Sequence, residues 1–223
     1  MKIFYLGTGA ADWTPDDAEN PEYRRNSSAL INGELLIDPG PCVPEALGTF
    51  GIDISNIRYV INTHPHSDHY NEDTLRMLTE AGAEFFDLSA GGDFTVGKYS
   101  ITALHGNHTI PVVHFIISDG EKKIFYALDG AWLMLHEFYA LKKAYVDYAV
   151  LDATVGFSHG DFRLFEHNDL RMVIEMKESL SRYVKRFCIS HMARTLHTGH
   201  AELQAAMKEY GIEVAKDGLE VEI

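Results

Sequence analysis

Three histidines and one aspartate lie within six positions of the segment Thr63-His64-Pro65-His66-Ser67-Asp68-His69-Tyr70. Imidazole nitrogens and carboxylate oxygens are suitable ligands for a borderline divalent cation. In an extended or turning segment, His64 and His66 can point to the same side, while Asp68 and His69 are displaced along it. One cation could bind the first pair, and a second cation could bind the other. Two cations about 3.5–4 Å apart can share a bridging hydroxide and act on both sides of a displacement reaction.

The alternative interpretation of this cluster is a polar, histidine-rich surface loop. The residues before it argue against that, because residues 57–61 are apolar and largely β-branched and predict a buried strand. That strand leads the chain directly into the cluster, and suitable partner residues follow downstream. The segment therefore predicts a metal site.

Apolar runs bounded by turn residues predict strands in both halves of the chain. The expected strands cover residues 3–6, 28–31, 35–38, 57–61, 94–96, 99–104, 112–118, 123–128, 148–151 and 186–189, with two short strands near the end. The expected helices run from Pro44 to about residue 50, through residues 75–81 after a cap at Asn71 or Asp73, and over residues 132–143, 168–183 and 198–210. Strands with helices between and after them predict one α+β domain over residues 1–223, an αββα sandwich of two packed mixed sheets with helices outside.

The composition limits the partners. Lysine and arginine number 19 and aspartate and glutamate 33, which gives a formal charge of −14. Such a surface repels long polyanions, and no basic run offers a local patch, so long nucleic acid is not the expected substrate. Residues 112–117 and 124–128 are too short to span a membrane, and residues 1–9 lack the apolar core of a signal peptide, so a cytoplasmic protein is expected. The two cysteines, Cys42 and Cys188, are too few for a cysteine zinc site.

A His-x-His-x-Asp-His segment after an apolar strand resembles the hallmark of the metallo-β-lactamase superfamily, and the likeness extends along the chain. The resemblance implies the αββα sandwich and two divalent metal ions, with Zn or Mn favoured and Fe as a third candidate. It also implies three ligands beyond the cluster: a histidine, an aspartate that bridges the metals, and a final histidine. The implied set is His64, His66 and His108 for the first metal, Asp68, His69 and His191 for the second, and Asp129 as the bridge.

Each of the three later ligands has an alternative interpretation. His105 follows the same predicted strand as His108, and we favour His108 because the family pattern has this ligand shortly before another strand. Asp129 could be an ordinary turn residue before a helix, and His191 a loop or capping histidine. Members that reduce oxygen or nitric oxide tend to have glutamate at the position of His66, so the present set resembles the hydrolytic branch.

The flanking segments resemble the PhnP-like subgroup, which contains cyclic phosphate phosphodiesterases and is more distantly similar to tRNase Z. The segments are Leu6-Gly7-Thr8-Gly9-Ala10-Ala11, Tyr23-Arg24-Arg25-Asn26-Ser27-Ser28, Leu36-Ile37-Asp38-Pro39-Gly40-Pro41, Leu151-Asp152-Ala153 and Glu166-His167-Asn168-Asp169-Leu170. In that subgroup a histidine before an Asp-Leu pair lies near the metals. The resemblance implies that His167 stabilises phosphoryl oxygens or protonates the leaving alkoxide. Without the resemblance, His167 could be a surface residue at the start of a helix.

Four other residues have open or supporting roles. Arg24 and Arg25 either form ion pairs in an acidic protein or support an anionic substrate near the metals. Asp38 is expected to orient a ligand histidine rather than to bind metal. His114 stands at a strand position where relatives usually have glycine or tyrosine, and its role is open.

The function expected from the sequence is metal-dependent hydrolysis by a hydroxide that bridges two metals. Asp68 would bind metal and could also accept a proton during attack. The leading hypothesis is a phosphodiesterase for a small, anionic, cyclic or nucleotide-like phosphate. A lactonase, thioesterase or β-lactamase-like hydrolase could use the same centre, and a non-catalytic metal-binding protein is the third hypothesis. Because relatives are often dimers, the resemblance also implies a homodimer.

Overall fold

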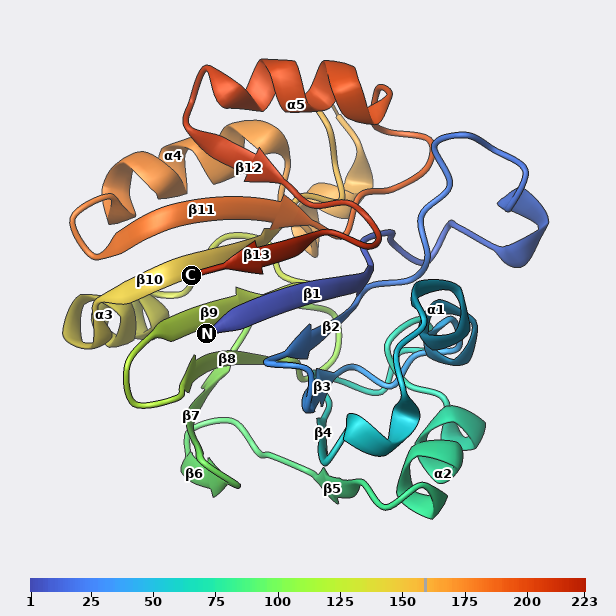
Figure 1. The fold of residues 1–223 in the computed structure, drawn as a ribbon. Helices are drawn as coiled ribbons and strands as arrows, with labels where there is room; N and C mark the ends of the chain where they lie inside the picture. The colour runs from blue at the N-terminus through green and yellow to red at the C-terminus, as the bar shows by residue number, and fades with distance from the viewer. Residues whose placement is uncertain (159) are drawn as a thin grey trace.

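The computed structural model describes residues 1–158 and 160–223. Within them the strands form a six-stranded sheet and a seven-stranded sheet, which pack face to face with helices on the outer sides (Figure 1). The first sheet contains, in spatial order, β13 (Glu220–Glu222), β1 (Lys2–Gly7), β2 (Ser28–Ile31), β3 (Leu35–Ile37), β4 (Tyr59–Ile61) and β5 (Glu84–Phe86). The second contains β12 (Ile212–Val214), β11 (Val184–Ser190), β10 (Val146–Asp152), β9 (Lys123–Ala127), β8 (Val113–Ser118), β7 (Tyr99–His105) and β6 (Asp93–Val96).

Both sheets are mixed. In the first, β1, β2 and β3 pair antiparallel, and β3, β4 and β5 pair parallel. In the second, β6 to β9 are antiparallel, and β9 to β12 are parallel. Parallel strands end at the same edge of a sheet, so the loops after β9, β10 and β11 lie together. The site described below is built on these loops.

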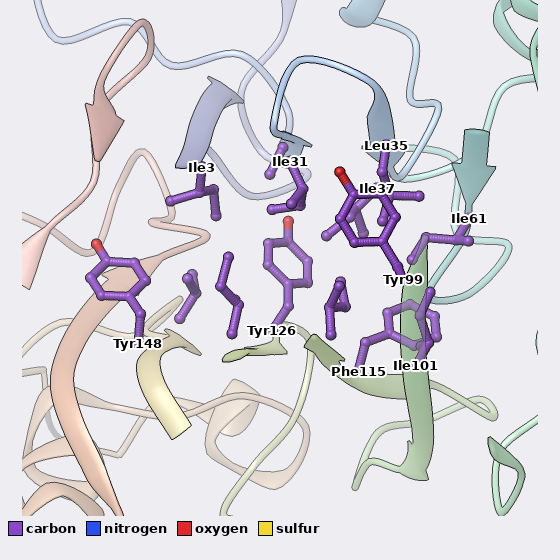
Figure 2. Close-up of a cluster of buried hydrophobic side chains, with 14 of the residues drawn as sticks. Ile3, Ile31, Leu35, Ile37, Ile61, Tyr99, Ile101, Phe115, Tyr126 and Tyr148 are labelled. Atoms are coloured by element: carbon purple, nitrogen blue, oxygen red, sulfur yellow. The ribbon is translucent and has the colours of Figure 1, made fainter. Parts of the chain in front are cut away.

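The main core fills the space between the sheets. Figure 2 shows Ile3, Ile31 and Ile37 of the first sheet facing Phe115 and Tyr126 of the second. These inward positions alternate along the strands with residues that face the helices, as the two-residue period of a strand requires. Burial of each large apolar side chain contributes about 1.5–3 kcal/mol, so this layer fixes the relative position of the two sheets.

Two further apolar clusters attach the helices. α1 (Val43–Phe50) and α2 (Glu72–Glu80) pack on the outer face of the first sheet. α3 (Leu135–Ala144), α4 (Leu170–Leu180) and α5 (His200–Lys208) pack on the outer face of the second. The predicted αββα sandwich is therefore confirmed. None of the helices in residues 1–158 and 160–223 is both long and apolar enough to cross a bilayer.

Several predicted boundaries were wrong by two or three residues. α3 begins at Leu135 rather than at residue 132, because Trp132 has a left-handed backbone with φ of 58°. α4 begins at Leu170, after the Asp169 side chain caps it by accepting from Met172 N at 2.7 Å. β4 begins at Tyr59, because Ile57 closes a 3₁₀ turn over Ile54–Asn56. Asn71, not Asp73, caps α2 by accepting from Thr74 N.

Candidate metal centre

The structure brings the seven predicted ligand side chains together on loops that follow strands. They form two groups in which the potential ligand atoms lie within 4.8 Å of one another. The first group is His64, His66, His108 and Asp129, and the second is Asp68, His69, Asp129 and His191. Asp129 belongs to both groups. This is the division predicted from the family resemblance.

Asp129 faces the two groups with different oxygens. Its Oδ2 lies 3.2 Å from His64 Nε2 and 3.6 Å from His108 Nε2. Its Oδ1 lies 3.0 Å from His191 Nε2 and 3.3 Å from His69 Nε2. The carboxylate is therefore oriented to bridge two cations.

Neighbouring oxygens fix the protonation of two ligand histidines. The Asp38 carboxylate can only accept, so His69 Nδ1, 2.8 Å from Asp38 Oδ2, carries a proton. The Thr63 hydroxyl donates to Asp38 Oδ1, so it accepts from His64 Nδ1 at 2.9 Å. The Nε2 atoms of His64 and His69 face the cluster and are the nitrogens that would bind metal once they carry no proton.

Two more histidines are held in the same way. The Glu166 carbonyl accepts from His108 Nδ1 at 3.1 Å. Thr154 donates its hydroxyl proton to Asp152 Oδ2 and accepts from His191 Nδ1 at 2.7 Å. Nδ1 of each ring is therefore protonated, and Nε2 is the nitrogen that faces the cluster.

The separations between these facing nitrogens test whether the residues fit divalent cations. His69 Nε2 and His191 Nε2 lie 3.2 Å apart, and His64 Nε2 and His66 Nδ1 lie 3.0 Å apart. Ligands at the usual zinc–nitrogen length in a tetrahedron are separated by about 3.3 Å. In addition, Asp129 Oδ1 is buried and accepts no hydrogen bond from any residue that the structure describes. The chemistry and spacing of this donor set fit two divalent cations.

The backbone at three strand ends turns these side chains inward. Asp38, Asp129 and His191 follow β3, β9 and β11, and all have left-handed conformations with φ of 63°, 56° and 63°. Such residues outside glycine are uncommon and cluster at functional sites. Gly40 is also required here, because a Cβ at that position would lie 2.5 Å from the Asp68 carbonyl oxygen.

Burial and charge set the ionisation of the ligands. Burial lowers the pKa of His64 and His108, which keeps these imidazoles neutral near pH 7. Burial alone would raise the pKa of Asp129, but His191 and His69 more than offset this and hold it well below its ordinary value. Burial would lower the pKa of His191, but Asp129 and Asp68 raise it to about 10 in the metal-free protein. Metal binding at the second group must therefore displace a proton.

His167 lies directly beside the two groups. Its ring centroid is 5.1 Å from that of His108 and 5.4 Å from that of His191. Asp152 Oδ2 lies 2.8 Å from His167 Nδ1 and also accepts from Asp129 N at 3.0 Å. Asp152 is fully buried, so one carboxylate holds both His167 and the backbone of the bridging aspartate.

A cavity of about 270 Å³ opens onto the centre. Its walls include Asp68, Asp129 and His167. Phe162 and Arg163, the first two residues of the 3₁₀ turn Phe162–Phe165, also line it. Arg163 is the one lysine or arginine among the described lining residues. Its Nε and Nη2 donate to the two oxygens of Asp161, each at 2.8 Å, and its Nη1 has no bonded partner in the described residues.

Other predicted candidates lie away from the centre. His105 is exposed, and its ring packs near His136, so the geometry favours His108 over it. Arg24 is buried against Thr8 and the Ala215 carbonyl. Arg25 pairs with Glu45 at 2.6 Å and Asp217 at 3.4 Å, which agrees with the ion-pair interpretation.

No role was predicted for Asp152, Thr154 or Arg163. Asp152 and Thr154 stand at the end of β10, beside the strand that leads to His191, and that placement was the available signal. Arg163 lies near His167 in sequence, but nothing in its neighbours indicates that it lines the cavity.

Comparisons with known proteins agree with this geometry. The sequence profile described as the metallo-beta-lactamase superfamily matches residues 24–71, which include Asp38 and the histidine cluster. A search of curated proteins finds no match.

Three similar solved structures cover nearly the whole chain. A diphosphatase from the PhnP family is 20% identical, with a TM-score of 0.75, and the match covers 100% of this chain and 97% of that one. The metallo-beta-lactamase fold protein YhfI from Bacillus subtilis is 15% identical, with a TM-score of 0.77 and coverages of 99% and 98%. Human tRNase Z, short form, is 16% identical, with a TM-score of 0.71 and coverages of 100% and 99%. These matches confirm the fold.

Proposed function

We propose, from the premise that this chain has the fold of the metallo-β-lactamase superfamily and a His/Asp cluster suited to two cations, that it is a metal-dependent phosphodiesterase. Its substrate would be a small, anionic, cyclic or nucleotide-like phosphate. The cations would be two divalent ions, with Zn or Mn favoured and Fe as a third candidate, because His/Asp sites accept all three. When bound, they would supply Lewis acidity and make water available as hydroxide near neutral pH.

The observation that carries the phosphodiesterase proposal is the position of His167. It lines the cavity beside the ligands, and its Nδ1 is held by Asp152. Because Nδ1 donates to a carboxylate, the other nitrogen can hold or release a proton toward a bound substrate. Cleavage of a phosphate diester with an alkoxide leaving group needs such a proton donor.

The rest of the cavity supports a small anionic substrate. A volume of about 270 Å³ lies just below the usual range for drug-sized ligands, which suits a small molecule. Arg163 Nη1 is available to a phosphate oxygen. The net charge of −14 disfavours long nucleic acid as the substrate.

Asp68 would have two functions. It lies 3.2 Å from His69 Nε2 and 3.4 Å from His191 Nε2, so it can complete the second ligand group. It also lines the cavity, where its second oxygen can orient or accept the proton of an attacking water.

The experiment is a hydrolysis screen with purified protein loaded with Zn²⁺ or Mn²⁺, with metal content measured by elemental analysis. Bis(p-nitrophenyl) phosphate and a cyclic nucleotide test the proposal, and a lactone and a thioester panel tests the alternatives. We expect diester turnover that a chelator abolishes and added metal restores. Lactone or thioester turnover without diester turnover would replace the proposal with the second hypothesis. Fewer than two metals at saturation, with no turnover, would favour the non-catalytic one.

A further inference from the structure

A buried histidine–glutamate pair lies directly behind the two loops that carry His108 and Asp129. His114 on β8 and Glu137 on α3 are 1% and 0% exposed. His114 Nδ1 lies 2.6 Å from Glu137 Oε1, and His114 Nε2 lies 3.0 Å from the Leu128 carbonyl oxygen. A carbonyl can only accept, so Nε2 carries a proton and donates it to the residue that precedes Asp129.

Glu137 anchors the pair to the start of α3. Its Oε2 accepts from Met134 N at 2.7 Å, so both carboxylate oxygens are bonded. The chain of hydrogen bonds therefore runs from the first turn of α3 through the His114 ring to the Leu128 carbonyl. Replacing a buried ion pair with apolar residues is often neutral for stability, so stability alone is a weak explanation for this one.

The ring also fills the space between the two ligand loops. A Cβ at Gly106 would lie 2.6 Å from His114 Nε2, and a Cβ at Gly130 would lie 3.0 Å from His114 Cε1. Gly106 is two residues before His108, and Gly130 follows Asp129. Both loops thus contact the same imidazole through glycine backbone.

The loops are joined to each other at the same place. Ala131 N donates to the Asn107 carbonyl at 3.0 Å, and Asn107 Nδ2 donates to the Ala131 carbonyl at 2.6 Å. A displacement of one loop therefore moves the other. Asp129 itself has a left-handed backbone, which must be held by such contacts.

We propose that His114 and Glu137 are positioning residues for the metal centre. The pair fixes the Leu128 carbonyl and the packing of Gly106 and Gly130, and so sets the separation of Asp129 and His108. It contacts neither the cavity nor a predicted ligand side chain, and it acts through backbone. The inference concerns metal affinity, so it stands independently of which bond the protein hydrolyses.

The main test is the double variant His114→Leu/Glu137→Leu, which replaces the pair with apolar side chains. Apparent affinity for Mn²⁺ and Zn²⁺ is measured by competition with a chromophoric chelator, and the melting temperature is measured without metal. We expect the affinity for metal to fall at least tenfold while the metal-free melting temperature stays near that of the wild type. The visible spectrum of the Co²⁺-loaded variant should also differ. Wild-type affinity and spectrum would overturn the proposal.

Glu137→Gln and Glu137→Leu keep the test decisive if the double variant does not fold. The glutamine oxygen can accept from Met134 N, and its amide can donate to His114 Nδ1, so every bond is retained without charge. We expect affinity within about twofold of wild type for Glu137→Gln and at least a fivefold loss for Glu137→Leu. Equal affinities for the two variants would overturn the proposal. His200→Leu is the control, since that histidine lies on α5 against Arg24, and its affinity should not change.

Discussion

The ligand groups and the wall segment Phe162–Glu166 border the same cavity but differ in how firmly they are held. His69 and His191 are 0% and 1% exposed, and their Nδ1 atoms are bonded to Asp38 and Thr154. Phe162 is 72% exposed, and Arg163 has its bonded partner Asp161 within two residues. On the proposed function, the metal centre would be part of the rigid sandwich, while substrate choice would depend on a short surface segment. The predictions below probe the two regions in turn.

The largest effect is expected in the ligand groups, from Asp129→Ala. This removes the carboxylate that faces both groups and leaves His191 without its main partner. We expect loss of tightly bound metal and a fall in kcat/KM of about a thousandfold or more. Elemental analysis after dialysis and rates at saturating metal check this. Full activity with two bound metals would mean that Asp129 is not the bridge.

The second-largest effect is expected from His167→Ala, because His167 lies between the ligand groups and the wall segment. We expect kcat to fall by about 10²–10⁴ for a diester with an alkoxide leaving group, with metal content unchanged. The loss should be much smaller for bis(p-nitrophenyl) phosphate, because p-nitrophenolate leaves without a proton. Equal losses on both substrates would contradict a role as proton donor.

The pH dependence of the hydrolysis rate tests the same role of His167 as a proton donor. Burial alone would lower the pKa of His167, but the Asp152 carboxylate raises it above its ordinary value of 6.5. The protonated form therefore persists above pH 6.5 and disappears as the pH rises through the folded pKa. We expect an alkaline loss of rate on the alkoxide diester in the wild type, and its absence in His167→Ala.

A smaller effect is expected from Asp38→Asn, because Asp38 contacts the ligand groups directly only through His69. Asparagine tolerates the left-handed backbone, but its amide nitrogen would meet either the His69 Nδ1–H or the Thr63 donors. We expect metal affinity to fall about 10–100-fold, measured by chelator competition. Asp53→Asn, at an exposed cap, is the matched control and should bind metal as the wild type does.

The smallest effect is expected on the wall, from Arg163→Ala. If Nη1 contacts a phosphate oxygen, KM should rise about tenfold with kcat and metal affinity nearly unchanged. Steady-state kinetics separate the two parameters. Arg76→Ala, on the exposed face of α2, is the control. An unchanged KM would mean that residues other than Arg163 bind the anion.

The sequence was most informative about candidate ligands that lie close together along the chain. The cluster His64 to His69 lies in one segment after one strand, so its ligand types and order could be read directly. The choice of His108 over His105 needed the family pattern, because His105 ends β7 and His108 follows only three residues later.

The roles of Asp152 and Thr154 could not be predicted, because their partners are distant in sequence. Asp152 meets His167 and the Asp129 backbone only when β9 and β10 lie side by side. Thr154 meets His191 across the neighbouring strand in the same way. The late start of α3 depends on the left-handed backbone of Trp132, which no local propensity indicates.

The left-handed backbone of Asp38 and Asp129 costs less than the contacts of their side chains return. Glycine would relieve roughly 1–2 kcal/mol of steric cost at such a position. At Asp38, however, glycine would leave the Thr63 amide and hydroxyl and His69 Nδ1 without their acceptor, and at Asp129 it would leave His191 without its main partner. Loss of one partner of a buried pair costs about 3–5 kcal/mol, so a directed-evolution library screened only for heat resistance, in the absence of metal, should still retain both aspartates.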